Sequence, residues 1–232
     1  QGRPVIVQAG ASEEGRELAA KSADVIFGAS QNLEMAQEFY GDVKGRLARY
    51  GREPSDLKVL PGLSVTVASS KREAQAKYDE LQDLIHPDHG LAFLSRRIGH
   101  DLTAMDPDIL MPDLPPIDDV GTRSGQMLEL AKRENWTLRQ LYQHFAAARG
   151  HMVLIGTPSM VADAMEGWVN KGACDGFNII PSIFPDEFES FVDLVVPELQ
   201  RRGLYRKYYE GNTLRERLGL RVPESQYVTA DA

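Results

Sequence analysis

The residues best suited to chemistry are Gly10, Ala11 and Ser12, which form a turn between an apolar run and the start of a helix. The β-branched residues 5–7 before the turn are typical of a strand that is covered on both faces. Ser12 is suited to cap the helix that follows, and the first N–H groups of a helix are free to bind an anion. Because no bulky side chain stands at Gly10 or Ala11, the turn is predicted to hold a phosphate dianion.

The known phosphate motifs do not match this turn. Its sequence, GASEEG, lacks the second glycine of a dinucleotide-binding turn, has no Gly-Lys-Ser/Thr, and carries Glu14 where a nucleophile elbow needs glycine. The carboxylates of Glu13 and Glu14 also oppose an anion. From the local pattern alone, the alternative that Ser12 is an ordinary helix cap stays open.

The elements that must position this turn alternate between strand and helix, which predicts a parallel α/β fold. An apolar run or a helical spacing of apolar residues marks each element. The predicted strands are residues 5–7 (ending before Gly10), 24–28, 57–68 (interrupted at Pro61-Gly62) and 175–181. The predicted helices are residues 12–23, 32–50, 69–85, 128–148, 157–171 and 185–202, with Pro197 bending the last of them.

Residues 86–127 interrupt this rhythm and are rich in Pro, Asp and Gly. The stretch is too long for an ordinary connection within a compact domain, so it is predicted to be an insertion that serves as a lid. The last thirty or so residues are interpreted as a wrapping tail. Residues 1–232 are thus predicted to form a single domain with the insertion inside it.

Composition narrows the function classes. The 232 residues are 42% hydrophobic, and 26 basic against 34 acidic residues give a net charge of -8, which disfavours nucleic acid and anionic membranes. A small-molecule partner is favoured. No signal segment or membrane span is evident, and the single Cys174 excludes an intrachain disulfide, so a cytoplasmic location is predicted.

Other chemical groups are given structural roles. Cys174 is interpreted as a small buried residue, because no partner base for a nucleophile is recognisable. His86 and His89 lie close together, but no third ligand is evident, so no metal site is predicted.

Four strand–helix units make half of an eightfold (β/α)8 TIM barrel, and they would leave apolar strand edges uncovered unless something pairs with them. The chain also opens at Gln1, without Met, and enters a strand almost at once. Both features indicate a piece of a longer protein.

Five motifs in order along the chain resemble one enzyme family. These are QAGASEEGRELAAKSADVIF (8–27), ENWTLRQL (134–141), GTPSMVADAMEGWV (156–169), DGFNIIP (175–181), and VVPELQRRGLYR with TLRERLGL near the end. The chain resembles the C-terminal half of FMN-dependent monooxygenases of the luciferase-like superfamily. It is most similar to the group of nitrilotriacetate, EDTA, dibenzothiophene-sulfone and long-chain alkane monooxygenases.

The resemblance implies an enzyme that takes reduced FMN from a separate flavin reductase. The flavin reacts with O₂ to form a flavin hydroperoxide, and one oxygen enters a small organic substrate. By residue matching, Ser12 contacts the FMN phosphate, with Gly10 and Ala11 allowing close backbone approach, and Trp136 lies near the substrate. Trp136 has an alternative role as a packing residue, and no catalytic residue is assigned.

Further residues are weaker candidates. Arg97 and His100 lie in the insertion, where relatives place polar active-site groups, although a solvated surface role competes. Asn178 and Ser182 flank the end of the fourth strand and are possible flavin contacts.

Because the first half of such a barrel supplies much of the isoalloxazine pocket, this polypeptide alone is not expected to be a competent monooxygenase. Two alternatives stay open: a flavin-free half-barrel that acts as a binding or assembly module, and a deazaflavin-dependent oxidoreductase of the same superfamily. A homo-oligomer is expected, since association hides exposed sheet edges.

Overall fold

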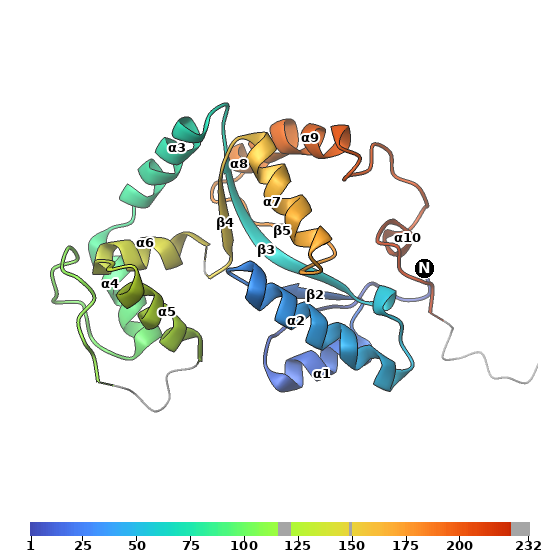
Figure 1. The fold of residues 1–232 in the computed structure, drawn as a ribbon, viewed down its shortest axis with the longest axis horizontal. Helices are drawn as coiled ribbons and strands as arrows, with labels where there is room; N and C mark the ends of the chain where they lie inside the picture. The colour runs from blue at the N-terminus through green and yellow to red at the C-terminus, as the bar shows by residue number, and fades with distance from the viewer. Residues whose placement is uncertain (116–121, 149, 224–232) are drawn as a thin grey trace, which may run out of the picture. The chain divides into compact units, whose positions relative to one another are not determined.

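The computed structural model describes residues 1–115, 122–148 and 150–223, which fall into two compact units (Figure 1). Unit 1 comprises residues 1–74 and the chain from 151 onward, and unit 2 comprises residues 75–150. Within the described ranges, no helix is both long and apolar enough to cross a bilayer.

Unit 1 is built on a parallel sheet, which confirms the predicted α/β class. Each strand is followed by a helical segment, so the connections run from the end of one strand back to the start of the next. The strands of the described chain are β1 (Val7–Ala9), β2 (Val25–Gly28), β3 (Lys58–Val67), β4 (Met152–Gly156) and β5 (Asn178–Ile179). Their order is β1-β2-β3-β4, and β5 also pairs with β3.

Strand β3 is long enough to pair with three other strands. Alternate residues of a strand direct their hydrogen-bonding groups to opposite edges. The Lys58 N–H donates to the residue before β2, and the Ala68 N–H donates to Gly156 at the end of β4. The carbonyls of Val59 and Leu63 instead accept from Asp175 and Ile180 on the β5 side. Strands β2 and β4 therefore lie end to end along one edge of β3, and β5 lies along the other.

Several helices of unit 1 pack against one face of this sheet. Ile26 and Val59 are buried in one cluster with the alanines of α1 and the apolar side of α2, and Figure 1 shows these two helices side by side. The second half of β3 packs against α7 and the 191–199 segment. The helical bounds are α1 (Glu13–Ser22), α2 (Leu33–Arg46), α7 (Pro158–Asn170), α8 (Asp186–Ser190), α9 (Val196–Arg201) and α10 (Leu214–Arg217), with 3-10 turns at Leu47–Tyr50 and Pro54–Asp56.

Strand β4 was absent from the sequence prediction. It is a short apolar run between Gly150 and Gly156, and no helical pattern claimed it. Its pairing with Leu63–Val67 depends on the unusual length of β3, which no local pattern reveals. Strand β5 is also shorter than the predicted residues 175–181, because only Asn178 and Ile179 keep register with β3.

The prediction that the first strand is covered on both faces is wrong. Val7 is 61% exposed and Ile6 is 42% exposed. In the described chain β1 pairs only with β2, which leaves its outer edge open, and since Ile6 and Val7 point to opposite faces, neither face is fully covered. The expectation of an uncovered apolar strand edge is confirmed by the same residues.

The predicted helix over residues 185–202 contains an interruption where proline was expected to bend it. Residues Phe191–Val195 form a π-helical turn between α8 and α9, and Pro197 follows in the first turn of α9. Proline has no N–H to donate to the preceding turn, which favours such a local widening of the helix.

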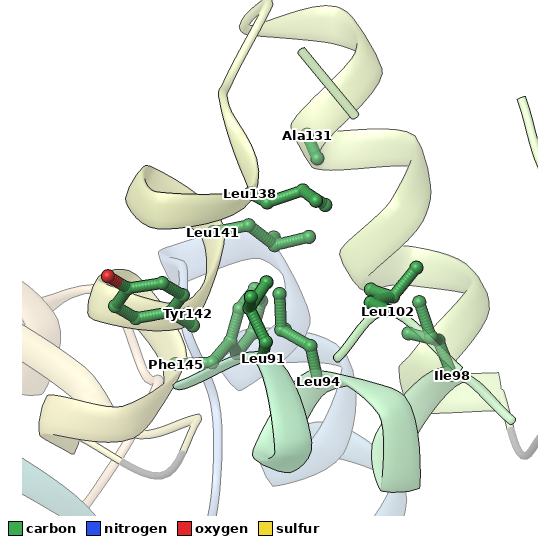
Figure 2. Packing of buried hydrophobic residues seen from close by; sticks show 9 residues of the cluster. All are labelled: Leu91, Leu94, Ile98, Leu102, Ala131, Leu138, Leu141, Tyr142 and Phe145. Atoms are coloured by element: carbon green, nitrogen blue, oxygen red, sulfur yellow. The ribbon is translucent and has the colours of Figure 1, made fainter. Parts of the chain in front are cut away.

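Unit 2 is helical and has its own core (Figure 2). Within the predicted insertion, residues 86–127, residues 87–98 form a helix whose apolar side is buried, and residues 116–121 lie outside the described part of the chain. The predicted helix over residues 128–148 is in fact two helices, separated near Asn135, which adopts a left-handed conformation with φ of 52°. The helices are α3 (Lys71–Asp83, which begins in unit 1), α4 (Pro87–Ile98), α5 (Thr122–Arg133) and α6 (Leu138–Ala148). The core residues are Leu91, Leu94, Ile98, Leu102, Ala131, Leu138, Leu141, Tyr142 and Phe145.

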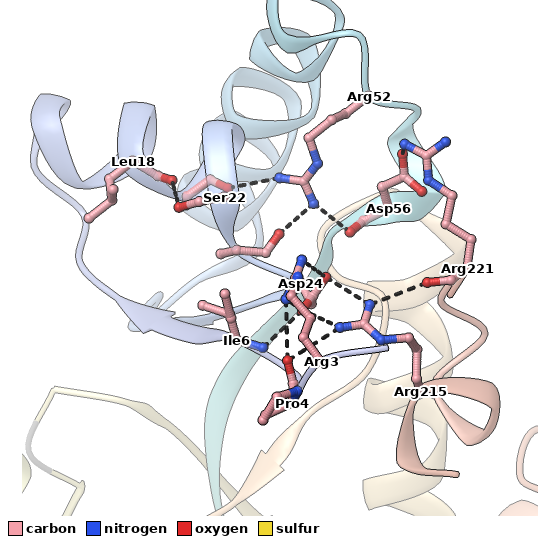
Figure 3. A network of polar contacts seen from close by, with 12 residues as sticks. Arg3, Pro4, Ile6, Leu18, Ser22, Asp24, Arg52, Asp56, Arg215 and Arg221 are labelled. Atoms are coloured by element: carbon pink, nitrogen blue, oxygen red, sulfur yellow. Dashed lines mark hydrogen bonds and ion pairs between the residues drawn. The ribbon is translucent and has the colours of Figure 1, made fainter. Parts of the chain in front are cut away.

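A buried ion pair joins Arg3, near the start of the sequence, and Arg215 of α10 to the start of β2 (Figure 3). Asp24 precedes this strand and is 3% exposed, and its carboxylate accepts hydrogen bonds from Arg3 and from Arg215 of α10. Burial raises the pKa of Asp24, but the hydrogen bonds from Arg215, Arg3 and the Ile6 N–H outweigh it and lower the pKa to about 2.

We expect the Asp24 pair to make unit 1 sensitive to acid. A depressed pKa adds stability above the unfolded value of 3.8, and this stability is lost as the pH falls through about 2. The free energy of unfolding of the native chain should therefore fall by about 2 kcal/mol more than that of Asp24→Asn between pH 5 and pH 2. At pH 7, Asp24→Asn should cost about 3 to 5 kcal/mol, because it leaves Arg215 buried without its partner.

Urea unfolding at the two pH values measures both effects. Asp193→Asn, at an exposed position of the same unit, is the matched control and should leave both values unchanged. Identical pH dependence of native chain and Asp24→Asn would contradict this account of the network.

Candidate functional site

The carboxyl ends of β1, β2 and β5 lie near one level of the sheet, beside the middle of β3, whereas β3 and β4 continue to Val67 and Gly156. The register places Ala9 beside Phe27, Phe27 beside Leu60, and Gly28 beside Pro61. On the other edge of β3, Gly62 is paired with Asn178. Since parallel strands bring the loops that follow them to the same end, the turn after β1 belongs to this rim, where α/β proteins bind their ligands.

The β1–α1 turn, residues 10–12, has the geometry of a helix cap. Ser12 has extended backbone angles, and its Oγ accepts a hydrogen bond of 3.1 Å from the Gly15 N–H, which confirms the predicted N-cap. The Arg16 N–H bonds to the Ser12 carbonyl. Within the described residues, the N–H groups of Glu13 and Glu14 form no hydrogen bond, and the Ser12 hydroxyl still has its own proton to donate. The exposed turn thus offers three donors to an anion.

The Gln8 side chain lies close to Gly10 of this turn and to Gly15 of α1. A Cβ on Gly10 would lie 2.8 Å from Gln8 Nε2, and one on Gly15 would lie 3.4 Å from the same atom. The Gln8 side chain therefore fills the space beneath the turn. Its Oε1 is buried and accepts no hydrogen bond from the described residues. Gly10 admits the Gln8 side chain from within the protein, in addition to leaving the backbone open on its outer side.

Two arginines hold the turn and its acidic neighbours. Arg16 donates from Nε to the Ala11 carbonyl (3.0 Å) and pairs with Asp42 of α2 (2.8 Å). Arg46 of α2 binds both carboxylate oxygens of Glu13, at 2.6 and 2.9 Å. The hydrogen bond from Arg46 lowers the pKa of Glu13, so that carboxylate is fully charged but paired. Nothing in the local sequence marks the role of either arginine.

His151 is a rim residue that the sequence analysis missed. Its ring stacks on Phe27 at 5.1 Å between centroids, and a Cβ on Gly62 would lie 2.5 Å from His151 Nδ1. Glycine at position 62 is therefore required for the imidazole to lie against β3. The signal that could have found His151 is its place directly before β4, the strand that the analysis also missed.

Trp136 lies in unit 2, in the short connection between α5 and α6. It packs on the core of that unit, and its ring is 4.7 Å from that of His144, which in turn contacts Phe145. Burial lowers the pKa of His144, so it is neutral at physiological pH. These contacts give Trp136 a packing role in unit 2, and its place near a substrate stays a prediction.

Three of the four weaker candidates are engaged within the protein. His100 Nε2 lies 2.8 Å from the Pro115 carbonyl, and the guanidinium of Arg97 lies over the Phe93 ring. Asn178 donates from its side chain to the Leu60 carbonyl (3.0 Å), which ties β5 to β3. That amide donor is already used inside the sheet.

The His86 imidazole caps α4, because its Nδ1 accepts from the Asp88 N–H, and its ring meets that of His89 edge-on. Across the described ranges, no group of three or more His, Cys, Asp or Glu is placed to hold a metal ion. Cys174 is 2% exposed, which confirms the small buried residue, and burial raises its pKa to about 12.

Comparison with known proteins defines the class of this parallel α/β chain. The model of the luciferase-like monooxygenase family matches residues 1–174. Nitrilotriacetate monooxygenase component A of Aminobacter aminovorans is 51% identical over 227 residues, which cover 97% of this chain and 50% of that protein. The chain belongs to the luciferase-like monooxygenase family, and the resemblance found in the sequence is confirmed.

Solved structures agree with this assignment. The crystal structure of DmoA from Hyphomicrobium sulfonivorans matches with a TM-score of 0.79 at 31% identity, over 93% of this chain and 45% of that one. The riboflavin lyase RcaE, solved with modified FMN and riboflavin, matches with a TM-score of 0.73 at 29% identity, over 94% and 48%. The chain spans about half the length of the relatives that it matches.

We expect the Cys174 thiol to be inert in the folded protein. With a pKa of about 12 it carries almost no thiolate at pH 8, whereas an unfolded cysteine is partly ionised there. Reaction with a disulfide reagent such as DTNB should be at least about 100-fold slower for the native chain than for the chain in urea. Rapid labelling of the native chain would reopen its role as a nucleophile.

Proposed function

We propose that this chain supplies the cofactor-phosphate part of an FMN-dependent monooxygenase that receives reduced FMN from a separate flavin reductase. The observation that carries the proposal is the β1–α1 turn, which offers three unpaired donors at the strand-end rim of a luciferase-like monooxygenase chain. A relative whose name marks it as one component of a monooxygenase supports the reductase, and a similar structure that holds modified FMN supports the cofactor.

The residues of the turn fit a phosphate dianion by their chemistry. The Ser12 hydroxyl would donate one hydrogen bond, and the N–H groups of Glu13 and Glu14 would donate two more along the axis of α1. Gly10 and Ala11 leave the outer side of the backbone open. When bound, reduced FMN supplies the chemistry that activates O₂ for transfer of one oxygen atom to a small organic substrate.

The other parts of the predicted function extend this proposal. Residues 86–127 would act as the substrate lid, and Trp136 would lie on the substrate side. Because the relatives are about twice as long, we assign the rest of the flavin pocket to chain outside this sequence. The hydroperoxide route, the cytoplasmic location and the homo-oligomer stay predictions from the sequence.

We expect Ser12→Ala to weaken the binding of reduced FMN without affecting the binding of reduced riboflavin, which lacks the phosphate. The loss should be about 1 to 3 kcal/mol, the scale of a hydrogen bond to a charged group. The measurement is an anaerobic titration of both flavins into the protein as its gene encodes it. Thr157→Ala is the matched control, because Thr157 caps α7 in the same unit by accepting from the Met160 N–H, away from the turn.

The two ligands separate the possible outcomes. An equal loss for FMN and riboflavin in Ser12→Ala would mean that the residue only caps the helix. If the native protein binds neither flavin, the monooxygenase proposal fails, and a flavin-free binding or assembly module takes its place.

A further inference from the structure

The first turn of α1 carries two carboxylates where the proposed phosphate would bind. Glu13 and Glu14 follow Ser12 directly, and the whole chain has a net charge of -8. Two free carboxylates beside a phosphate dianion would repel it and offset the attraction of the helix N-terminus. The structure treats the two side chains differently, because Glu13 is paired and Glu14 is not.

Arg46 is the partner that neutralises Glu13. Its two terminal nitrogens bind the two oxygens of that carboxylate, and this bidentate geometry fixes the carboxylate against α2. Glu14, by contrast, is exposed and forms no ion pair with the described residues.

Arg46 is itself held in place from several sides. It is 8% exposed, its Nε and a terminal nitrogen donate to Asp42 (2.8 and 3.0 Å), and it also reaches Glu17 (2.9 Å). Asp42 in turn pairs with Arg16, which holds the Ala11 carbonyl of the turn. A continuous set of charge-assisted hydrogen bonds therefore runs from the interior side of α2 to the backbone of the β1–α1 turn.

We propose that Arg46 is a positioning residue for the phosphate: it holds the Glu13 carboxylate against α2 and offsets its charge, so that a dianion can occupy the helix start. The inference rests on the proposed function of the β1–α1 turn. Arg46 acts through Glu13 and touches no ligand itself. Its effect must therefore depend on the Glu13 charge and on the presence of a phosphate.

A double-mutant cycle tests this dependence. Reduced FMN and reduced riboflavin are titrated anaerobically into the gene-encoded protein and its variants Arg46→Gln, Glu13→Gln and the two combined. Arg46→Gln should weaken the binding of reduced FMN about tenfold and leave the binding of reduced riboflavin unchanged. The reason is that the released Glu13 carboxylate repels only the phosphate. Glu13→Gln alone should change FMN affinity by less than about twofold, since that charge is already offset.

The combined variant gives the decisive value. If Glu13→Gln restores FMN affinity in the Arg46→Gln background to within about threefold of the native protein, Arg46 acts through the Glu13 charge. The inference fails, and Arg46 has only a structural role, if the combined variant binds FMN as weakly as Arg46→Gln does. The same holds if Arg46→Gln loses as much affinity for riboflavin as for FMN.

Two further variants, Arg46→Lys and Glu14→Gln, extend the test. Arg46→Lys replaces Arg46→Gln if that variant unfolds. Lysine keeps the charge but cannot bind a carboxylate in the same bidentate way. This variant should lose less FMN affinity, and the same Glu13→Gln change should restore it. Glu14→Gln should tighten the binding of FMN, because the charge of the Glu14 carboxylate is not offset by an ion pair with the described residues. Equal affinity of the native protein for FMN and riboflavin would overturn the phosphate site itself, whereas a native preference for FMN without rescue overturns only the role of Arg46.

Discussion

The constraint on which unit 1 depends is the pairing of β3 with three other strands. The first half of β3 pairs with β2, the second half pairs with β4, and β5 joins its opposite edge at Gly62 and Leu63. All of these strands run parallel, so their carboxyl ends are set by their register on β3. The level of the rim, and with it the place of the β1–α1 turn, follows from this one strand through β2 and β1. Gly62 is central, because it admits the His151 ring where β2 ends and β4 begins.

Much of this fold could be predicted from local patterns in the sequence. The caps at Ser12 and Thr157 and the proline at position 197 act on their own backbone neighbours, so the residue types themselves indicate the element boundaries. Strand β4 could not be predicted in this way, because its five apolar residues become a strand only through the extra length of β3. The exposure of Val7 could not be predicted for the same reason, since the burial of a strand depends on which other parts of the fold lie beside it.

In the candidate site, too, some residues could be predicted from local sequence and others depend on tertiary packing. Ser12 and its turn were evident because cap, turn and helix are contiguous in sequence, and the family resemblance added the phosphate. Arg46 lies 33 residues beyond Glu13, on the next helix, and nothing in the spacing of α2 marks it as different from a solvated basic residue. Its pairing with Glu13 depends on how α1 and α2 pack against Ile26 and Val59, which is a tertiary property.

The acidic residues at the start of α1 then take on a different meaning. Glu13 and Glu14 counted against a phosphate when their sequence positions alone were considered, because like charges repel. In the fold, Arg46 binds Glu13 within a set of part-buried and exposed hydrogen bonds that also fixes the Ala11 carbonyl through Asp42 and Arg16. A carboxylate that is held by a rigid guanidinium contributes order to the turn at little electrostatic cost. At the proposed anion site, the effect of the acidic residues would therefore depend on their pairing as well as on their number.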